Sequence, residues 1–456
     1  MKLDNVFRNL PEVEGPIEKK LAFNIKLKWT LIILAIFFIL ANIPLYGLSN
    51  NALSRFSSLE AILGADFGSI ISLGIGPIVM ASIILQLLVG SKILNIDVTT
   101  KEGKKYFQGL QKILVFFFIF FEASIYVLMG GLEAMPGYTW VLIAQLCLGG
   151  LAIVFMDEIT SKWGFGSGVS LFIAAGVSRS IFTRLFQFMS AQGSFEPSCK
   201  VLVLISSLIA NPPNTTGAIL AGAAILVTIG IFLIVVWAQS LKVEIPLSYD
   251  RLRGYGMKWP LAFFYTSVIP VILVSALAAN IHLFGSLLQN WLGHPTFLGT
   301  FSSNGVVEAG FSYWIGNVDL LTAVITNSFQ VRMLWQVLGH VGFYVFFSTI
   351  FALFWVKTSG MDATSQVKNI MSSGLTIPGF RKDERILESV LNRYILPLTI
   401  MGGFAIGLLA ALTDTLGAVV AGTSILLVIM IMYQLYQSIA QQHAVDMHPA
   451  LRKMIK

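Results

Sequence analysis

Residues 73–90 read LGIGPIVMASIILQLLVG, a stretch that is apolar enough to lie in a membrane. It nevertheless begins with Gly74, Gly76 and Pro77, and these residue types start or end helices rather than continue them. The preceding residues, ADFGSIIS at 65–72, contain Asp66 and two serines and are poorly suited to contact with lipid. The stretch therefore predicts a broken helix that starts abruptly behind a short polar approach, near a central cavity.

The composition of the whole chain is that of an integral membrane protein. Of its 456 residues, 56% are hydrophobic and 12% are charged, whereas soluble domains carry about 25% charged residues. The 40 glycines and 34 phenylalanines suit helices that pack closely in lipid. The first 28 residues are too charged for a cleavable signal peptide, and we expect a short interfacial helix that ends in a turn.

Ten segments are apolar enough to cross the membrane, for which about 20 residues are needed. The predicted spans are 29–48, 74–90, 113–132, 139–156, 169–185, 217–238, 259–284, 333–356, 394–413 and 415–440. The loops that follow the even-numbered spans contain sixteen lysines and arginines, against five in the loops that follow the odd-numbered spans. Because basic loops remain in the cytoplasm, the even-numbered loops and both termini are expected there.

The ten spans divide into five and five at the long loop 186–216. With an odd number of spans in each half, related halves would be inverted relative to each other. The second span of the first half carries Gly76-Pro77, and the second span of the other half carries Ile269-Pro270. Broken helices at matching places in two halves point to a central site or pathway.

The chain carries no recognisable catalytic signature. It has no His-Glu-x-x-His motif and no Walker-type loop. The run GFGSG at 164–168 joins two predicted spans, whereas a dinucleotide fingerprint must open a helix after a strand, so we interpret it as a flexible loop. We therefore expect no enzymatic activity, no metal and no cofactor.

Glu122 lies midway through the third predicted span and is the single carboxylate that we expect inside the membrane. A charge at the bilayer centre costs at least roughly 2.5–3.5 kcal/mol, so such a residue faces a cavity or a partner. It could couple protons in a transporter, or it could make a polar contact between helices or line a wet pathway. Gln86 and Asn280 are partners by residue type, and the second interpretation is favoured. His282 and His340 are interpreted as ordinary helix-end or core residues.

Two apolar pairs and two basic loops complete the candidate features. Ile75 and Val79 lie four residues apart and share a helix face, as do Val169 and Ile173, which by spacing alone indicates core packing. The loops DRLRGYGMK at 250–258 and GFRKDER at 379–385 could bind anionic lipid headgroups or a polyanion such as RNA.

Several long segments, in the same order, resemble the SecY family, the central subunit of the Sec protein-conducting channel, and are most similar to archaeal members. They are LGIGPIV and QLLVG within 73–90, MDEITSKWGFGSGVSLFIAAGVS at 156–178, KVEIPL at 242–247, SVIPVIL at 267–273 and GFRK at 379–382. The resemblance implies an all-α membrane protein with ten spans in two inverted, pseudo-symmetric halves around an hourglass pore. The implied regions are an N-terminal amphipathic segment at 1–27, halves at 28–190 and 217–440, an external linker at 191–216 and a cytoplasmic tail at 441–456.

The resemblance also assigns site residues. The family's apolar pore ring, which grips the moving polypeptide and blocks ions, corresponds here to Ile75, Val79, Val169, Ile173, Ile272 and Leu427. The plug helix corresponds to about 56–67. The lateral gate lies between spans 2–3 and 7–8, where Glu122 and Asn280 match polar positions, Gln86 is a further candidate and Met80 replaces the third polar member. Arg381 matches a loop arginine that contacts the ribosome or a motor ATPase, with Lys382 beside it, and either Arg251 or Arg253 is the counterpart in the other loop.

The resemblance implies a passive, gated channel of the cell membrane that moves unfolded secretory chains and releases membrane segments into lipid. The implied partners are SecE/gamma-type and beta-type small membrane subunits, the ribosome through its RNA, signal sequences, nascent polypeptides and the bilayer. An apolar constriction without fixed charges suits chains of any sequence. The alternative is a secondary transporter with inverted repeats that uses Glu122 for ion coupling. The apolar ring, the single intramembrane acid and the long basic loops favour the channel.

Overall fold

The computed structural model describes residues 10–17, 21–98, 100–188, 199–209, 214–249, 256–266, 268–302, 306–372, 375–376 and 383–447. Within these ranges, nine helices are long and apolar enough to cross a membrane, and two further apolar helices are shorter. The nine are α2 (Phe23–Ala41), α5 (Lys101–Leu128), α6 (Thr139–Trp163), α7 (Gly168–Phe186), α9 (Thr215–Ser240), α10 (Ile269–Leu292), α13 (Val331–Thr358), α15 (Glu384–Thr415) and α16 (Gly422–Met447). The shorter two are α4 (Gly76–Gly90), which matches the second predicted span, and α8 (Lys200–Ile209). The predicted class, an all-α membrane protein, is confirmed.

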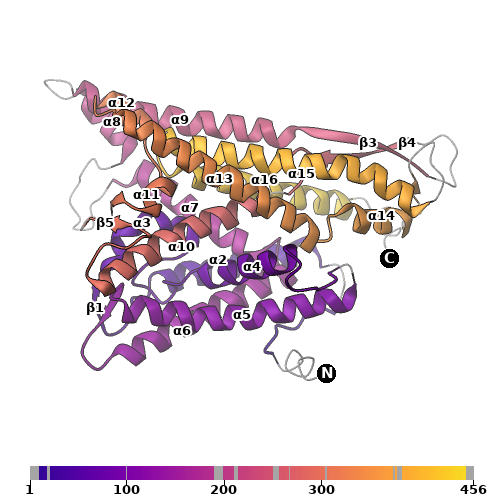
Figure 1. Cartoon of the computed structure of the whole chain (residues 1–456), viewed down its shortest axis with the longest axis horizontal. Helices are drawn as coiled ribbons and strands as arrows, with labels where there is room; N and C mark the ends of the chain where they lie inside the picture. Colours follow the sequence, from indigo (N-terminus) through magenta and orange to yellow (C-terminus); the bar gives the residue numbers. More distant parts are fainter. Residues whose placement is uncertain are drawn as a thin grey trace.

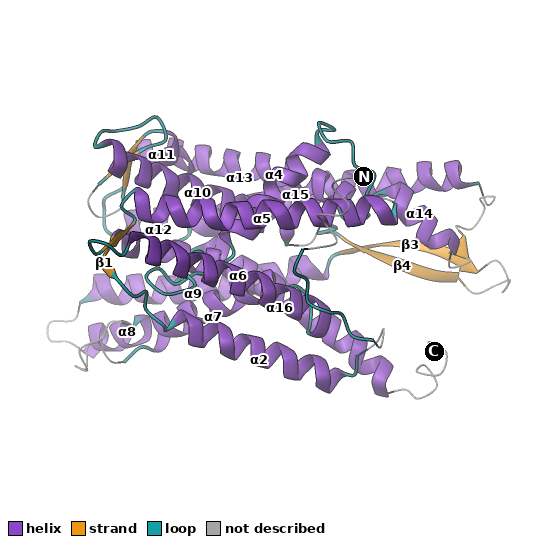
Figure 2. Ribbon diagram, turned by 90° about the horizontal axis from the view of Figure 1, so that it is seen from below, coloured by secondary structure: helices purple, strands orange, loops and turns teal. Residues whose placement is uncertain are grey.

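Short helices and strands lie toward the two ends of the bundle (Figure 1). They are the 3-10 helix at Ala52–Phe56, α3 (Ser57–Leu63), α8 (Lys200–Ile209), α11 (Phe311–Ile315), α12 (Leu320–Ile325), α14 (Ala363–Ser372), β1 (Leu48–Asn51), β2 (Leu132–Ala134), β3 (Lys242–Tyr249), β4 (Gly256–Ala262), β5 (Thr300–Phe301), β6 (Val307–Ala309) and β7 (Leu375–Thr376). We call the end at which α4, α6, α9 and α13 finish the basic end, because the sixteen basic residues counted above follow, in sequence, the predicted spans that match these helices. The hairpin of β3 and β4 projects there, near α14 (Figure 2).

The matching helix breaks are formed by prolines in the first turn. Pro77 occupies the start of α4, and Pro270 occupies the start of α10. At this position the missing N–H of proline costs no helical hydrogen bond, and its fixed φ suits a helix start. The second span of each half therefore begins with a proline inside the bundle.

Three sequence expectations about element boundaries are corrected. The span predicted at 259–284 begins only at Ile269, because residues 256–262 pair instead with 242–248 as an antiparallel hairpin. The span predicted at 29–48 runs from Phe23 to Ala41, so the first helix starts before the predicted domain boundary at 27. The interfacial helix is not present in 10–17, and the rest of it falls partly on residues 1–9 and 18–20, outside the described part of the chain.

The segment 10–17 is instead held to the end of α6 by polar contacts. Lys162 pairs with Glu12 at 2.5 Å, and the indole N–H of Trp163 donates to the Glu14 carbonyl. The hydrogen bond from Lys162 lowers the pKa of Glu12. Such an anchor fixes where the chain enters the first helix.

Close helix packing in the second half depends on small residues. A Cβ at Gly407 of α15 would lie 2.7 Å from the Tyr344 carbonyl oxygen of α13, closer than real contacts allow. Glycine at this position lets two membrane helices approach backbone to backbone. The pair α13 and α15 forms the rigid wall against which α10 and α16 pack.

Candidate functional site

The six residues of the expected ring belong to, or pack against, one apolar cluster. Ile75 immediately precedes α4 with Val79 one turn on, while Val169 and Ile173 lie in the first turns of α7. Ile272 and Leu427 approach from α10 and α16, in the other half of the chain. Five of the six are buried members of one apolar cluster, and Val169 packs against it partly buried. The cluster also extends to α2 and α9, so burial by itself does not separate a ring from the surrounding core.

A carboxylate that the sequence analysis did not single out holds one of these residues in place. Asp157 of α6 accepts a hydrogen bond from the backbone N–H of Val169 at 2.9 Å. The first N–H groups of a helix have no partner within that helix, and a carboxylate there also faces the positive end of the helix dipole. Asp157 thus caps α7 from a neighbouring helix and fixes the height at which Val169 enters the bundle.

The short helix α3 lies between the two halves and is bonded to the start of α4. It packs against α7 and against α10. The N–H of Ile75 donates to the carbonyl of Leu63, the last residue of α3, at 2.8 Å. Gly74 has φ +52°, and a Cβ there would lie 2.3 Å from that same carbonyl oxygen. Glycine is the residue that tolerates both the left-handed backbone and the close approach.

An ion pair ties the segment after α3 to α7. Asp66 meets Arg179 at 2.6 Å, and Glu60 accepts the N–H of Phe67 at 3.0 Å. Burial raises the pKa of Glu60. These groups line a polar pocket of about 370 Å³ between α2, α3 and α7. The pocket lies beside the short helix, at the end opposite the basic end.

The expected gate residues are buried, but they do not hydrogen bond to one another. Glu122 of α5 lies over Gly76, where a Cβ would be 2.9 Å from a carboxylate oxygen. Gln86 and Asn280 are 3% and 1% exposed. Within the described part of the chain, both oxygens of Glu122, both amide atoms of Asn280 and Oε1 of Gln86 have no hydrogen-bond partner. Hydrogen bonds among these three residues, which are partners by residue type, are therefore not formed in the described part of the chain.

Met80 takes a bridging position in place of a polar side chain. It is partly buried on α4 and packs against both large apolar clusters of the bundle. A flexible thioether fills irregular gaps of this kind. The polar gate residues accordingly stand in an apolar setting, where buried polar atoms without partners raise the free energy.

A second buried acid lies near the end of α15, one residue beyond the predicted span. Asp414, at the end of α15, is 5% exposed and lies 3.5 Å from Nε2 of His340 on α13. Its Oδ1 accepts from the N–H and the hydroxyl of Thr423, at the start of α16. Nδ1 of His340 lies 2.6 Å from the carbonyl oxygen of Ile315 and must donate to it. His340 is thus part of a polar network that joins α11, α13, α15 and α16, not an ordinary core residue.

This network was missed because its members are far apart in sequence. Asp414 falls one residue beyond the span predicted at 394–413, and nothing local to it points to a histidine some 70 residues earlier. The signal that could have found the pair is the combination of an acid and a histidine at matching depths of two apolar segments.

The two basic loops converge through strand pairing. Ser248 and Tyr249 of β3 pair with Thr376 and Leu375 of β7. The sites predicted from the sequence, Arg251, Arg253, Arg381 and Lys382, lie outside the described residues. The described strands β3 and β7, which precede these residues in sequence, lie side by side.

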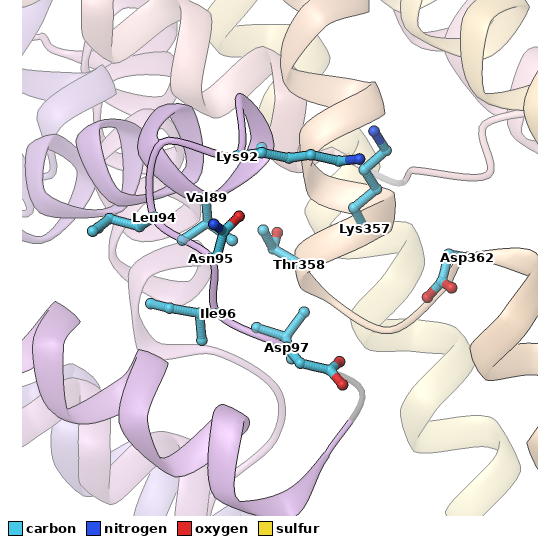
Figure 3. A pocket seen from close by; sticks show the side chains of 11 residues that line it. Val89, Lys92, Leu94, Asn95, Ile96, Asp97, Lys357, Thr358 and Asp362 are labelled. Atoms are coloured by element: carbon cyan, nitrogen blue, oxygen red, sulfur yellow. The ribbon is translucent and has the colours of Figure 1, made fainter.

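A pocket of about 510 Å³ opens where α4 and α13 finish, also at the basic end (Figure 3). It is lined by Val89, Gly90, Lys92, Leu94, Asn95, Ile96, Asp97, Val98, Lys357, Thr358 and Asp362. Lys92 extends across it toward Lys357 (Figure 3). The pocket separates the two helix ends at the mouth of the expected gate.

These features define a polytopic helical membrane protein with a short helix lodged between its halves. The SecY family profile matches residues 69–436, and the profile of the plug domain of Sec61p matches residues 36–68. The chain belongs to the SecY family, as the sequence resemblance indicated.

Known proteins resemble the chain over its full length. It is 44% identical to the protein translocase subunit SecY of Methanothermobacter thermautotrophicus, covering 100% of this chain and 98% of the relative. Two solved structures are each 36% identical and cover 99% of both chains. One, with a TM-score of 0.84, concerns the plug domain of the SecY protein, which stabilises the closed state of the translocation channel and maintains a membrane seal. The other, with a TM-score of 0.81, is Sec61 in the canine ribosome-channel complex from the endoplasmic reticulum.

Proposed function

We propose that this chain is the pore-forming subunit of a protein-conducting channel, which moves unfolded polypeptides across the membrane and releases apolar segments sideways into lipid. The observation that carries the proposal is the placement of α3. This helix is too short to span a membrane, lies between α7 and α10 of opposite halves, and bonds to Ile75. A movable helix over an apolar constriction is the arrangement that a gated channel requires.

The aliphatic ring supplies the seal. Ile75, Val79, Val169 and Ile173 from one half face Ile272 and Leu427 from the other. Branched apolar side chains exclude water and ions from a narrow pore, because wetting such a constriction is unfavourable. They make no directional bonds, so a chain of any sequence passes without being held.

The plug helix α3 closes the path beside the ring. Among its described links to the bundle are the bond from Ile75 to Leu63, the ion pair of Asp66 with Arg179 and the apolar packing of α3. An exposed or half-exposed ion pair contributes only about 0–1 kcal/mol. A translocating chain could therefore displace the plug at modest cost.

The lateral gate lies between α4 and α5 on one side and α10 and α13 on the other. The direct packing of α4 on both α10 and α13 supports a gate that is closed at rest. Gln86, Glu122 and Asn280 sit at the gate with unpaired polar atoms. Opening the gate would hydrate these atoms, which offsets part of the cost of separating apolar helices.

Crosslinking a stalled chain tests the central claim. A cysteine at Ile272, in the first turn of α10, should form a crosslink to a secretory polypeptide that is arrested midway, because the ring surrounds the chain in transit. The matched control is a cysteine at Leu226, which is 71% exposed on α9 and should crosslink to lipid. Crosslinks to the polypeptide at Leu226 but not at Ile272 would place the path elsewhere.

The converging loops at the basic end form the binding surface for the ribosome. Arg251 or Arg253, with Arg381 and Lys382, would contact ribosomal RNA, whose phosphates bind basic side chains in a salt-dependent way. The pairing of β3 with β7 supports one composite surface. This end would then be cytoplasmic, together with both termini, in a cell-membrane protein whose small SecE/gamma-type and beta-type subunits complete the complex.

Reversing the charge of Arg381 tests this surface. Arg381→Glu should weaken ribosome binding about tenfold at low salt and flatten its salt dependence, since one phosphate contact is replaced by repulsion. Affinity is measured by co-sedimentation across a salt series, with Arg393→Glu, farther along the same segment, as the control. If both variants lose the same ribosome affinity, the loss comes from the change in net charge and not from a specific contact of Arg381.

The chain also divides into halves at 28–190 and 217–440, joined by the segment 191–216, with the first helix entering slightly earlier than that boundary. The support is the pair of proline-initiated helices α4 and α10 at equivalent places. A secondary transporter that couples ions through Glu122 is not favoured, because no charged side chain of the described residues pairs with this carboxylate.

A further inference from the structure

The end of α4 is pressed against an aromatic ring of α13. Gly90 is the last residue of α4. A Cβ built on it would lie 2.3 Å from Cδ1, 2.5 Å from Cγ and 2.9 Å from Cε1 of Phe354. Real Cβ atoms do not approach other atoms this closely, so the ring occupies the space that any side chain at position 90 would need.

This contact stands where the two helices stop packing. Toward the membrane interior, Ile83 of α4 and Phe351 of α13 are buried in one apolar cluster. Beyond Gly90 the helix ends border the pocket of about 510 Å³ instead (Figure 3). Lys92 has φ +62°, which turns the chain out of the helix two residues after Gly90. Gly90 and Phe354 thus close the seam between α4 and α13 at the basic end.

The contact requires both a missing side chain and a large one. Glycine in the middle of a helix costs about 0.5–1 kcal/mol relative to alanine, and at helix C-termini its advantage comes from the left-handed backbone. Its φ is not in the left-handed region, so backbone conformation gives no reason for glycine at position 90. The remaining reason is the ring of Phe354, which occupies the space that a side chain at position 90 would fill.

We propose that Gly90 and Phe354 form the latch at the basic end of the lateral gate, and that the absence of a side chain at position 90 is what allows the gate to shut. A methyl group at position 90 acts as a wedge and shifts the balance from the closed gate toward the open one. The proposal rests on the gate assigned above, since it gives that gate a specific closing contact.

The test measures how strongly translocation depends on the signal sequence. Purified complex in vesicles is given two secretory reporters, one with an intact signal sequence and one with a weakened signal sequence. Gly90→Ala should raise translocation of the weakened reporter about tenfold, because overpacking by one methyl destabilises the closed state. Gly230→Ala on α9 is the matched control, since a Cβ there meets open space, and it should behave as wild type.

A compensating change separates a latch from general damage. Phe354→Ala combined with Gly90→Ala removes the ring that the new methyl would meet, so the double variant should return toward wild type. Phe354→Trp, with Gly90 unchanged, enlarges the ring that packs on Gly90 and should also favour the open gate. This variant replaces Gly90→Ala in the test if Gly90→Ala does not assemble. Wild-type behaviour of Gly90→Ala, or no relief in the double variant, overturns the latch.

The same assay keeps this proposal apart from the proposed function. If the wild-type complex does not move the intact reporter, the channel assignment fails whatever the variants do. If wild type moves it and Gly90→Ala resembles Gly230→Ala, the channel stands and the latch does not.

Discussion

Replacing Ile75, Val79, Val169 and Ile173 together with glycine should make vesicles that contain the complex leak ions, with a resting flux at least about tenfold above wild type. Ile75, Val79 and Ile173 are buried in the central apolar cluster, and Val169 packs against it partly buried. Removing them widens the constriction and exposes peptide groups, so water and then ions can enter. The measurement is the decay of an imposed ion gradient in vesicles.

The control for this leak keeps the number of glycines constant. Ile219, Leu226, Ile229 and Leu233 of α9 are all more than half exposed, so their replacement by glycine weakens a helix without touching the centre. The gradient should persist in that variant. The ring assignment would be wrong if the ring variant did not leak ions, or if the ring variant and the α9 variant leaked equally.

Asp414→Ala is expected to lower the free energy of unfolding by about 3 kcal/mol, because it leaves a buried partner without its counterpart. The change removes the acceptor of both hydrogen bonds from Thr423 and the neighbour of His340. Leu427 lies one turn beyond Thr423 on α16, so the same change should loosen one member of the ring. Unfolding is measured by denaturant titration of the purified complex in detergent.

Two further variants identify the cause of that loss. Asp414→Asn keeps an oxygen that can accept from Thr423 and should lose less stability. Asp414→Ala combined with His340→Leu removes both partners and should cost less than the sum of the single changes, as expected for coupled residues. Strict additivity would show that the two side chains act separately and would contradict the network.

Sequence reasoning was most reliable where the property is local. A run of about 20 apolar residues is unfavourable in water and favourable in lipid, so each span can be recognised from its own composition. All ten predicted spans correspond to helices, and Gly76-Pro77 and Ile269-Pro270 mark helix starts as expected. The SecY resemblance then suggested which of many buried aliphatic residues form the ring, which spacing alone did not.

Sequence reasoning failed where the outcome depends on what packs opposite. The apolar run at 259–262 became a strand because β3 pairs with it, not a helix as its hydropathy suggested. Asp157 caps α7, Asp414 meets His340, and Gly90 receives Phe354, in each case through a residue on a different element.

The sequence by itself determined that this protein lies in a membrane and where its apolar helices fall, since these depend on the transfer of each segment from water to lipid. Only the tertiary structure decided which apolar faces meet each other and which meet lipid. The physical reason is that lipid and protein interior are about equally apolar. Hydropathy therefore cannot tell a lipid-facing residue from a pore-lining or gate-closing one, and the distinction comes from shape, polar pairing and the residues opposite.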